Sequence, residues 1–280
     1  MSVWVNGRRR STLDYRDRGL NYGDGLFETM RVLGRRIRLL DYHLDRLCAG
    51  CRRLGIEAPH AAHLRRELER IASAQNDAIL KLIVTRGSGP RGYRPTGRER
   101  PTRIVQLHAL PPGSASQAAG PARVRLCATP LSINARLAGL KTLNRLDAVL
   151  ARAEWRDARI WEGLMGDGAG GWVCGTMSNL FLVQGRRLMT PMLNRCGVAG
   201  VMRRWILANA ALLSLRPVER RIRWRDLASA DEVFMSNAVV GIRSVRTIER
   251  SAGGTLRFSC FGAANGLRAL LDAQCAAHYG

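Results

Sequence analysis

The sequence is poor in lysine: of its 45 basic residues only two, Lys81 and Lys141, are lysine, and the other 43 are arginine. A guanidinium stays protonated in proteins, whereas an amine can lose its proton and attack a carbonyl carbon. A lysine in a chain that otherwise uses arginine indicates a position where nucleophilic chemistry excludes arginine. Lys141, in the stretch AGLKTLNRLD, is the first candidate for a Schiff-base lysine. A solvent-exposed lysine without a role is the alternative, since Lys81 is equally rare.

Long apolar runs are also missing. No segment approaches the roughly 18 consecutive apolar residues that read as a membrane-spanning helix, and residues 1–7 (MSVWVNG) lack the basic head and long apolar core of a signal peptide. We therefore expect a cytoplasmic protein without a membrane partner. With 280 residues, 46% of them hydrophobic, the chain can bury the core of two modest domains or one large one.

The cysteines do not form an even set, which argues against a disulfide framework in a chain of this size. Cys48 and Cys51 form a C-x-x-C motif, but it lies inside an apparent helix, with no second pair and no histidine at ligand spacing. We expect reduced thiols and no metal site. The remaining cysteines are scattered, at positions 127, 174, 196, 260 and 275.

The formal net charge of +23 suggests a nucleic-acid partner through attraction to phosphates. The arginines, however, are spread in pairs along the whole chain and no single element holds them. A general use of arginine on solvated faces explains this pattern as well as RNA binding does. We therefore expect a small anionic substrate to benefit from the charge and do not expect a nucleic-acid partner.

Hydrophobic periodicity predicts an α+β protein with two domains rather than a regular βαβ array. We expect an N-terminal domain at 1–112, a linker at 113–121 that is rich in Pro, Gly, Ser and Ala, and a C-terminal domain at 122–280. A helix is predicted to start with a cap at Asp41 and to stop at Gly55. Further segments are expected as a β-hairpin around residues 3–9, strands near 26–33, 78–85, 103–109, 160–165, 171–174 and 179–183, and helices near 59–74 and after 197.

Three parts of the sequence suit cofactor chemistry on an amine, which needs a lysine for an aldehyde, an anion site for a phosphate and a group that sets the charge of the ring nitrogen. The segment GVAGVMR at 197–203 is a loop that enters a helix, where exposed N–H groups can bind an anion. It matches neither the P-loop nor the dinucleotide-binding fingerprint. Alone, it is weak evidence.

Five ordered motifs together resemble the fold type IV pyridoxal-phosphate family, which includes D-amino-acid and branched-chain aminotransferases and aminodeoxychorismate lyase. Among these branches the chain looks most similar to the lyase. The resemblance implies a two-domain, D-amino-acid aminotransferase-like fold with the cofactor between the domains, and a homodimer. The motifs are DRGLNYGDGLFET at 17–29, HLDR at 43–46, TRGSGPRGY at 85–93, KTLNR at 141–145 and GTMSNLF at 175–181.

This resemblance implies a role for each matching position. Lys141 would form the Schiff base with pyridoxal 5'-phosphate and then move the proton. Arg91 and Tyr93 match the loop for the substrate carboxylate, often lent by the partner subunit. The other positions would bind the cofactor: Arg46 with the N–H groups of Val201, Met202, Asn237 and Ala238 at the phosphate, Val198 against the ring, and Asn179 near the ring hydroxyl.

Cys174 departs from the family pattern, which has a glutamate immediately before the GTMSNLF run. That carboxylate pairs with the ring nitrogen and keeps it protonated, whereas a thiol cannot supply the same charge-assisted hydrogen bond. Two outcomes are open. The enzyme is slow or inactive, or its chemistry needs a less protonated ring, which fits elimination better than transamination.

The function implied is a pyridoxal-phosphate-dependent carbon–oxygen lyase that forms 4-aminobenzoate and pyruvate from 4-amino-4-deoxychorismate, on the path to folate. One alternative is an aminotransferase for D- or branched-chain amino acids. Another is a catalytically impaired relative that binds a partner or RNA. The exact substrate among anionic amines and the role of Lys81 stay open at this point.

Overall fold

The computed structural model describes residues 2–110, 120–250 and 253–279 and divides them into two compact units. Unit 1 consists of the residues up to 110 together with Leu140–Asn144, and unit 2 of residues 120–139 and 145–278. The segment Leu140–Asn144, which carries Lys141, is thus grouped by its contacts with the N-terminal part of the chain. Most of the predicted linker at 113–121 lies outside the described residues, so that boundary stays a prediction.

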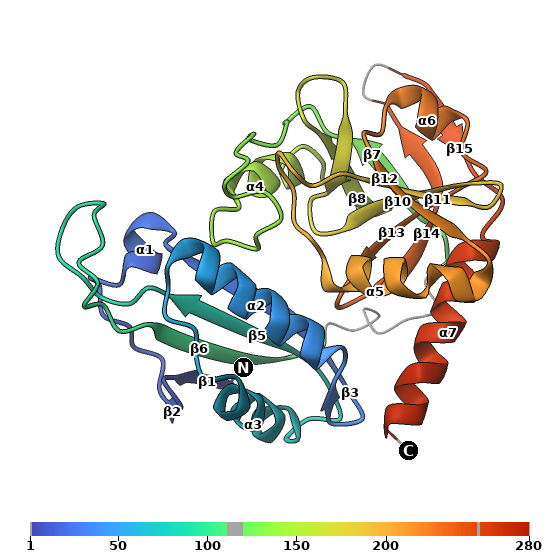
Figure 1. Cartoon of the computed structure of the whole chain (residues 1–280). Helices are drawn as coiled ribbons and strands as arrows, with labels where there is room; N and C mark the ends of the chain where they lie inside the picture. The colour runs from blue at the N-terminus through green and yellow to red at the C-terminus, as the bar shows by residue number, and fades with distance from the viewer. Residues whose placement is uncertain (1, 111–119, 251–252, 280) are drawn as a thin grey trace. The chain divides into compact units, whose positions relative to one another are not determined.

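Unit 1 is a six-stranded antiparallel sheet with two helices against it, α2 and α3 (Figure 1). The strand order is β2-β1-β6-β5-β3-β4, and each neighbouring pair is antiparallel. Its strands are β1 (Ser2–Val5), β2 (Arg8–Arg9), β3 (Gly25–Leu33), β4 (Arg36–Ile37), β5 (Asp77–Thr85) and β6 (Thr102–Ala109). Its helices are α1 (Arg18–Tyr22), α2 (Leu40–Leu54) and α3 (Ala61–Ala72).

Alternation along β5 shows how this sheet divides its two faces. Ala78, Leu80, Leu82 and Val84 are fully buried, whereas every second residue between them is only half-buried. A period of two is what a strand with one face in the core requires. Lys81 belongs to the half-buried face, opposite Thr29 of β3 in the register of the two strands.

The predicted helix after residue 40 is present, but Asp41 does not cap it. Its N-cap is Leu39, which has a left-handed backbone (φ 56°) and makes no side-chain cap hydrogen bond. Asp41 lies in the first turn and forms an ion pair with Arg65 of α3. Gly55 ends the helix with φ 62°, as the sequence predicts, because a glycine accepts this conformation without a Cβ clash.

Unit 2 is built on a nine-stranded mixed sheet. The path runs β12-β11-β10-β13-β14-β7-β8-β9, β15 adds to β14, and β9 also pairs with β10. That last pairing closes β10, β13, β14, β7, β8 and β9 into a ring of six strands. The strands are β7 (Ala122–Leu126), β8 (Ile160–Gly166), β9 (Trp172–Gly175), β10 (Asn179–Gln184), β11 (Arg187–Pro191), β12 (Arg216–Arg220), β13 (Glu232–Asn237), β14 (Gly241–Glu249) and β15 (Thr255–Arg257).

The helices of unit 2 are mostly short. They are α4 (Leu146–Arg152), α5 (Val201–Asn209), the 3₁₀ helix η1 (Ala210–Leu213), α6 (Trp224–Ala228) and α7 (Gly262–Tyr279). Apolar residues of the sheet form its core, including Phe181 stacked on Phe234 at 4.9 Å between ring centroids. Within the described residues no helix has the length and hydrophobicity that a membrane span requires. The mixed α+β class predicted from the sequence is confirmed.

Candidate active site

Lys141 is held to β3 of unit 1 by main-chain hydrogen bonds on both sides. The N–H of Phe27 donates to the Lys141 carbonyl at 3.0 Å, and the N–H of Leu143 donates to the Gly25 carbonyl at 3.0 Å. The Nζ atom of Lys141 lies 4.1 Å from the centroid of the Phe27 ring, and the Nζ atom of Lys81 lies 5.6 Å from the same centroid. The amines of both lysines therefore lie near the same aromatic ring. The main-chain hydrogen bonds to β3 fix the position of the Lys141 backbone.

Arg46 of α2 is anchored by a buried carboxylate, Glu28 of β3, which is 2% exposed. The Nε atom of Arg46 donates to Glu28 Oε1 at 2.8 Å, and its Nη2 atom pairs with Glu28 Oε2. The Nδ1 atom of His43 lies 2.6 Å from the same Oε2 atom. These contacts hold the guanidinium of the predicted phosphate ligand in one orientation.

Burial and neighbouring charges determine the protonation states of Glu28 and His43. Burial acts to raise the pKa of Glu28, but the charge of Arg46 and the His43 hydrogen bond outweigh it and lower the pKa to about 2. Burial lowers the pKa of His43 in spite of its bond to Glu28. We conclude that an ionised Glu28 accepts from a neutral His43, whose Nε2 atom is buried and has no hydrogen-bond partner within the described residues.

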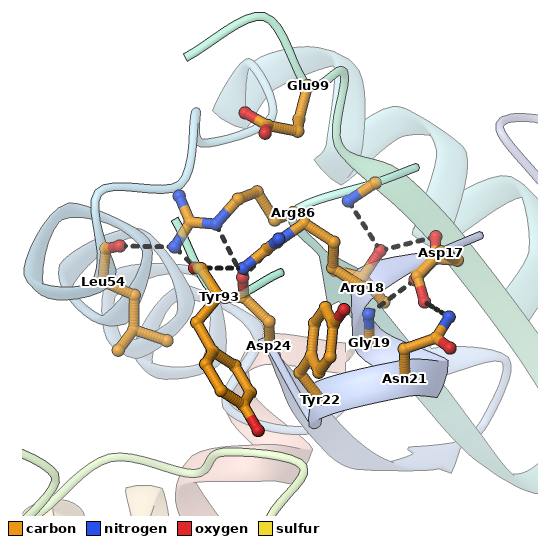
Figure 2. A network of polar contacts seen from close by, with 12 residues as sticks. Asp17, Arg18, Gly19, Asn21, Tyr22, Asp24, Leu54, Arg86, Tyr93 and Glu99 are labelled. Carbon is orange, nitrogen blue, oxygen red and sulfur yellow. Dashed lines mark hydrogen bonds and ion pairs between the residues drawn. The ribbon is translucent and has the colours of Figure 1, made fainter. Parts of the chain in front are cut away.

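Arg91 and Tyr93 lie in a loop of unit 1 with both side chains exposed, Tyr93 to 84%. The ring of Tyr93 packs edge-on against Tyr22 of α1, with 5.4 Å between the centroids (Figure 2). The side chains predicted for the substrate are thus outside the core, where they can reach a ligand. Their roles stay predictions.

In unit 2, Cys174 and Asn179 face each other in the antiparallel pair of β9 and β10 that closes the ring of strands. Burial raises the pKa of Cys174 to about 12, so the thiol is protonated at physiological pH. Position 174 therefore supplies no negative charge. The departure from the family's glutamate is a chemical difference and not a substitution by another anion.

Asn179 is tied to the loop that precedes α5. Its Nδ2 atom donates to the Val198 carbonyl at 2.8 Å, and a Cβ atom on Gly200 would lie 2.0 Å from its Oδ1 atom. Only glycine fits at this distance. The same loop pairs with Gly139, whose N–H donates to Gly197 and whose carbonyl accepts from Ala199, both at 3.0 Å. Asn179 and Val198 thus form one local group.

Helix α5 begins without a side-chain cap, because its N-cap residue is Gly200, and its first turn includes the N–H groups of Val201 and Met202. Such an end attracts an anion through these donors and the helix dipole. A second group of backbone donors lies between β13 and β14, where Asn237 Oδ1 accepts from Val239 and Val240 at 3.0 and 2.8 Å and so shapes the turn that includes Ala238.

Glu162 of β8 is a site residue that the sequence analysis missed. It is fully buried, and its two oxygens accept from the hydroxyls of Thr176 and Ser178, both at 2.6 Å, and from the N–H groups of Thr176 and Met177 at 3.1 and 3.2 Å. These bonds shape the turn that leads into Asn179. A single acid inside an otherwise apolar strand was the available signal, since a buried carboxylate needs partners.

The structure brings the predicted residues together in two groups. Unit 1 holds Arg46, Arg91, Tyr93 and Lys141, and unit 2 holds the remaining ones, of which Cys174 and Asn179 pair directly and Asn179 contacts Val198. No described group of three or more His, Cys, Asp or Glu side chains is arranged to hold a metal ion.

Comparisons with known proteins identify the family of the chain. The model of the amino-transferase class IV family matches residues 25–248. An aminodeoxychorismate lyase of Vibrio harveyi is 32% identical over 248 residues, which cover 88% of this chain and 90% of that protein.

Solved structures are similar over nearly the whole chain. The 4-amino-4-deoxychorismate lyase of Pseudomonas aeruginosa shares 43% identity with a TM-score of 0.90, covering 97% of this chain and 98% of that one. A hypothetical aminotransferase of Mycobacterium tuberculosis in its PLP-bound form has a TM-score of 0.82 at 20% identity, covering 98% of both chains, and shows the fold alone. The resemblance inferred from the five motifs is confirmed, and the chain belongs to the class IV aminotransferase family.

Proposed function

We propose that the protein is a pyridoxal-phosphate-dependent lyase that converts 4-amino-4-deoxychorismate to 4-aminobenzoate and pyruvate. The observation that carries this proposal is the placement of Lys141, whose backbone is bound to β3 on both sides and whose amine lies over the Phe27 ring. The similarity to lyases of this name, at 43% and 32% identity, supports the choice within the family.

The residues present fit the cofactor in each unit. In unit 1, Lys141 would bind its aldehyde and the fixed guanidinium of Arg46 would bind its phosphate. In unit 2, the uncapped start of α5 offers N–H donors to a phosphate, which is the observation that supports the fit there. The residues assigned in unit 2 are Val201, Met202, Asn237 and Ala238 at the phosphate, Val198 at the ring and Asn179 near the ring hydroxyl.

When bound, the cofactor supplies an electron sink for the amine-bearing carbon of the substrate. The chain would supply the base: the Nζ atom of Lys141 would remove the proton from that carbon. The carbon–oxygen bond would then break as the substrate ring becomes aromatic, and the enolpyruvate that leaves would take up a proton at its methylene carbon to become pyruvate. The charge of Arg91 and the hydroxyl of Tyr93 would hold the carboxylates of the substrate.

Cys174 favours elimination over transamination. A protonated thiol at this position cannot stabilise a positive ring nitrogen as a carboxylate does, so the cofactor is a weaker electron sink. Elimination that ends in an aromatic product has its own driving force, and this offsets the weaker sink. A neutral residue at position 174 is therefore compatible with the lyase reaction.

An aminotransferase for D- or branched-chain amino acids is the second candidate, because the family contains such enzymes and carries their name. It needs the protonated ring that Cys174 does not secure. The test is to incubate the holoenzyme with 4-amino-4-deoxychorismate without an amino acceptor. The lyase releases 4-aminobenzoate and pyruvate in equal amounts. Release of neither product, together with transfer of the amino group of a D- or branched-chain amino acid to an added keto acid, would refute the lyase assignment.

We further propose a cytoplasmic homodimer acting in folate biosynthesis, in which the loop of Arg91 and Tyr93 is lent to the partner subunit. The exposure of both side chains supports this arrangement. Purified protein that shows no visible absorbance after incubation with pyridoxal phosphate would instead favour a binding protein that uses the basic surface.

A further inference from the structure

Two sequence motifs of unit 1, at 17–29 and 85–93, are joined to each other by hydrogen bonds. The N–H of Arg18 donates to the Gly87 carbonyl at 2.9 Å, and the N–H of Gly89 donates to the Arg16 carbonyl at 3.3 Å. The Thr85 hydroxyl donates to the buried carboxylate of Asp17 at 2.8 Å. Helix α1 and the loop from Gly87 to Tyr93 therefore share main-chain hydrogen bonds at the start of the loop.

The side chain of Arg18 extends this contact to the far part of the loop. It is only 4% exposed, and its Nη1 and Nη2 atoms donate to the carbonyls of Gly92 and Tyr93 at 2.9 and 2.8 Å. Its Nε atom donates to Asp24 at 2.9 Å, and its guanidinium lies 4.9 Å from the centre of the Tyr22 ring. All three nitrogens are used, in the fork geometry that lysine lacks.

Tyr22 and Asp24 support the same contact, as Figure 2 shows. The Tyr22 hydroxyl accepts from the N–H of Gly92 at 3.1 Å. Asp24 also accepts from Arg86 at 2.8 Å, and Arg86 donates to the carbonyl of Leu54 at the end of α2. Burial acts to raise the pKa of Asp24, but Arg86 and Arg18 lower it, so the carboxylate stays ionised.

The loop thus has a fixed backbone at residues 92–93, whereas the side chains of Arg91 and Tyr93 are exposed. A long loop of glycine, proline and arginine otherwise has many conformations, and ordering it on binding costs free energy. We propose that Arg18, oriented by Asp24 and Tyr22, is the positioning residue that fixes Gly92 and Tyr93 and so presents Arg91 and Tyr93 to an anionic substrate. The substrate part of this inference rests on the proposed function.

The direct test of the fixed backbone is limited proteolysis of the full-length protein with trypsin, which cuts the Arg91–Gly92 bond. Arg18→Lys keeps the charge but loses the fork, so we expect this bond to be cut roughly tenfold faster than in the wild type. Arg16→Lys is the matched control, because Arg16 is exposed and its side chain pairs with Asp14. It should leave the cutting rate unchanged.

Steady-state kinetics of the holoenzymes test the consequence for the substrate. Arg18→Lys should raise KM for 4-amino-4-deoxychorismate roughly tenfold with kcat within about twofold and an unchanged cofactor spectrum. Tyr22→Phe removes only the hydroxyl contact to Gly92 and should give a smaller change in the same direction. This second variant keeps the test decisive if Arg18→Lys folds poorly.

These experiments distinguish a failure of the fixed loop from a failure of the proposed function. Equal cutting of the wild type, Arg18→Lys and Tyr22→Phe would refute the fixed loop whatever the reaction is. A reduced kcat with an unchanged KM in Arg18→Lys would refute the positioning role of Arg18. A wild-type holoenzyme that forms no 4-aminobenzoate would refute the proposed function, while the cutting rates would still report whether Arg18 holds the loop.

Discussion

The two units treat charge in different ways. In unit 1 the candidate site residues include three cations, Arg46, Arg91 and Lys141, and acids hold arginines in place. The buried Glu28 holds Arg46, and the half-buried Asp24 holds Arg18 beside the substrate loop. In unit 2 the candidates are backbone N–H groups, an amide and a neutral thiol. In the proposed function, unit 1 would therefore provide the fixed positive charges and the reactive amine, whereas unit 2 would provide neutral donors.

Replacement of Lys141 should have the largest effect, because its amine is the group proposed to bind the cofactor aldehyde and to remove the substrate proton. Lys141→Arg keeps a positive charge but not a neutralisable amine, and we expect pyruvate release to fall by at least about 1,000-fold. Lys81→Arg is the matched control, since it alters the other lysine beside the Phe27 ring. If Lys81→Arg lost activity and Lys141→Arg kept it, the assignment would be reversed.

Glu28→Gln tests the charged side of the comparison. It leaves Arg46 and His43 without their buried anion, and breaking a buried ion pair costs about 3 kcal/mol of unfolding free energy, measured by urea denaturation. The variant should also bind pyridoxal phosphate more weakly, since Arg46 loses its orientation. An unchanged unfolding free energy would show that the contact between Glu28 and Arg46 does not anchor helix α2.

The same residue predicts a pH dependence. The folded-state pKa of Glu28 is lowered to about 2, so its contribution to stability is present above the pKa of an unfolded glutamate, about 4.3, and is lost as the pH falls toward 2. Wild-type protein should therefore lose more unfolding free energy than Glu28→Gln between about pH 5 and pH 2. Parallel pH profiles for the two proteins would contradict this assignment.

Cys174→Glu tests the neutral side of the comparison and should have the smallest effect on the lyase rate. A carboxylate there would stabilise the protonated form of the ring nitrogen, shift the visible absorbance of the holoenzyme and raise any transaminase side activity roughly tenfold, the effect of one charge-assisted hydrogen bond. Cys174→Ser stays neutral and should change neither. Identical spectra for both variants would show that position 174 does not face the ring nitrogen.

Local patterns predicted much of the fold. The strand near 78–85, the hairpin turn at Asn6–Gly7 and the helix that ends at Gly55 were all predicted, because each depends on neighbouring residues. The alternation of burial along β5 was not, since residues 78–85 form a nearly continuous apolar run. The five-residue helix α1 and the cap at Leu39 were not readable. The first is too short for a periodic pattern, and the second is a residue type that rarely adopts a positive φ.

The candidate site shows the same limit. The sequence motifs pointed to Lys141, Arg46 and the loop of Arg91. Glu28 and Arg18, which orient Arg46 and the loop, lie within the motif at 17–29, but no role could be assigned to them from the sequence. Arg18 contacts carbonyls 74 and 75 residues away, and Glu162 binds a turn 14 to 16 residues later. Such pairs are created by the tertiary fold. A single acid in an apolar strand, as at Glu28 and Glu162, is the sequence signal that marks them.

The proposed function depends on the amine of Lys141, and the chain has only one other lysine, Lys81. The direct measurement is borohydride reduction of the protein with bound pyridoxal phosphate, followed by peptide mapping by mass spectrometry. We expect one labelled peptide, carrying the adduct on Lys141. A label on Lys81, or no label on either lysine, would contradict it.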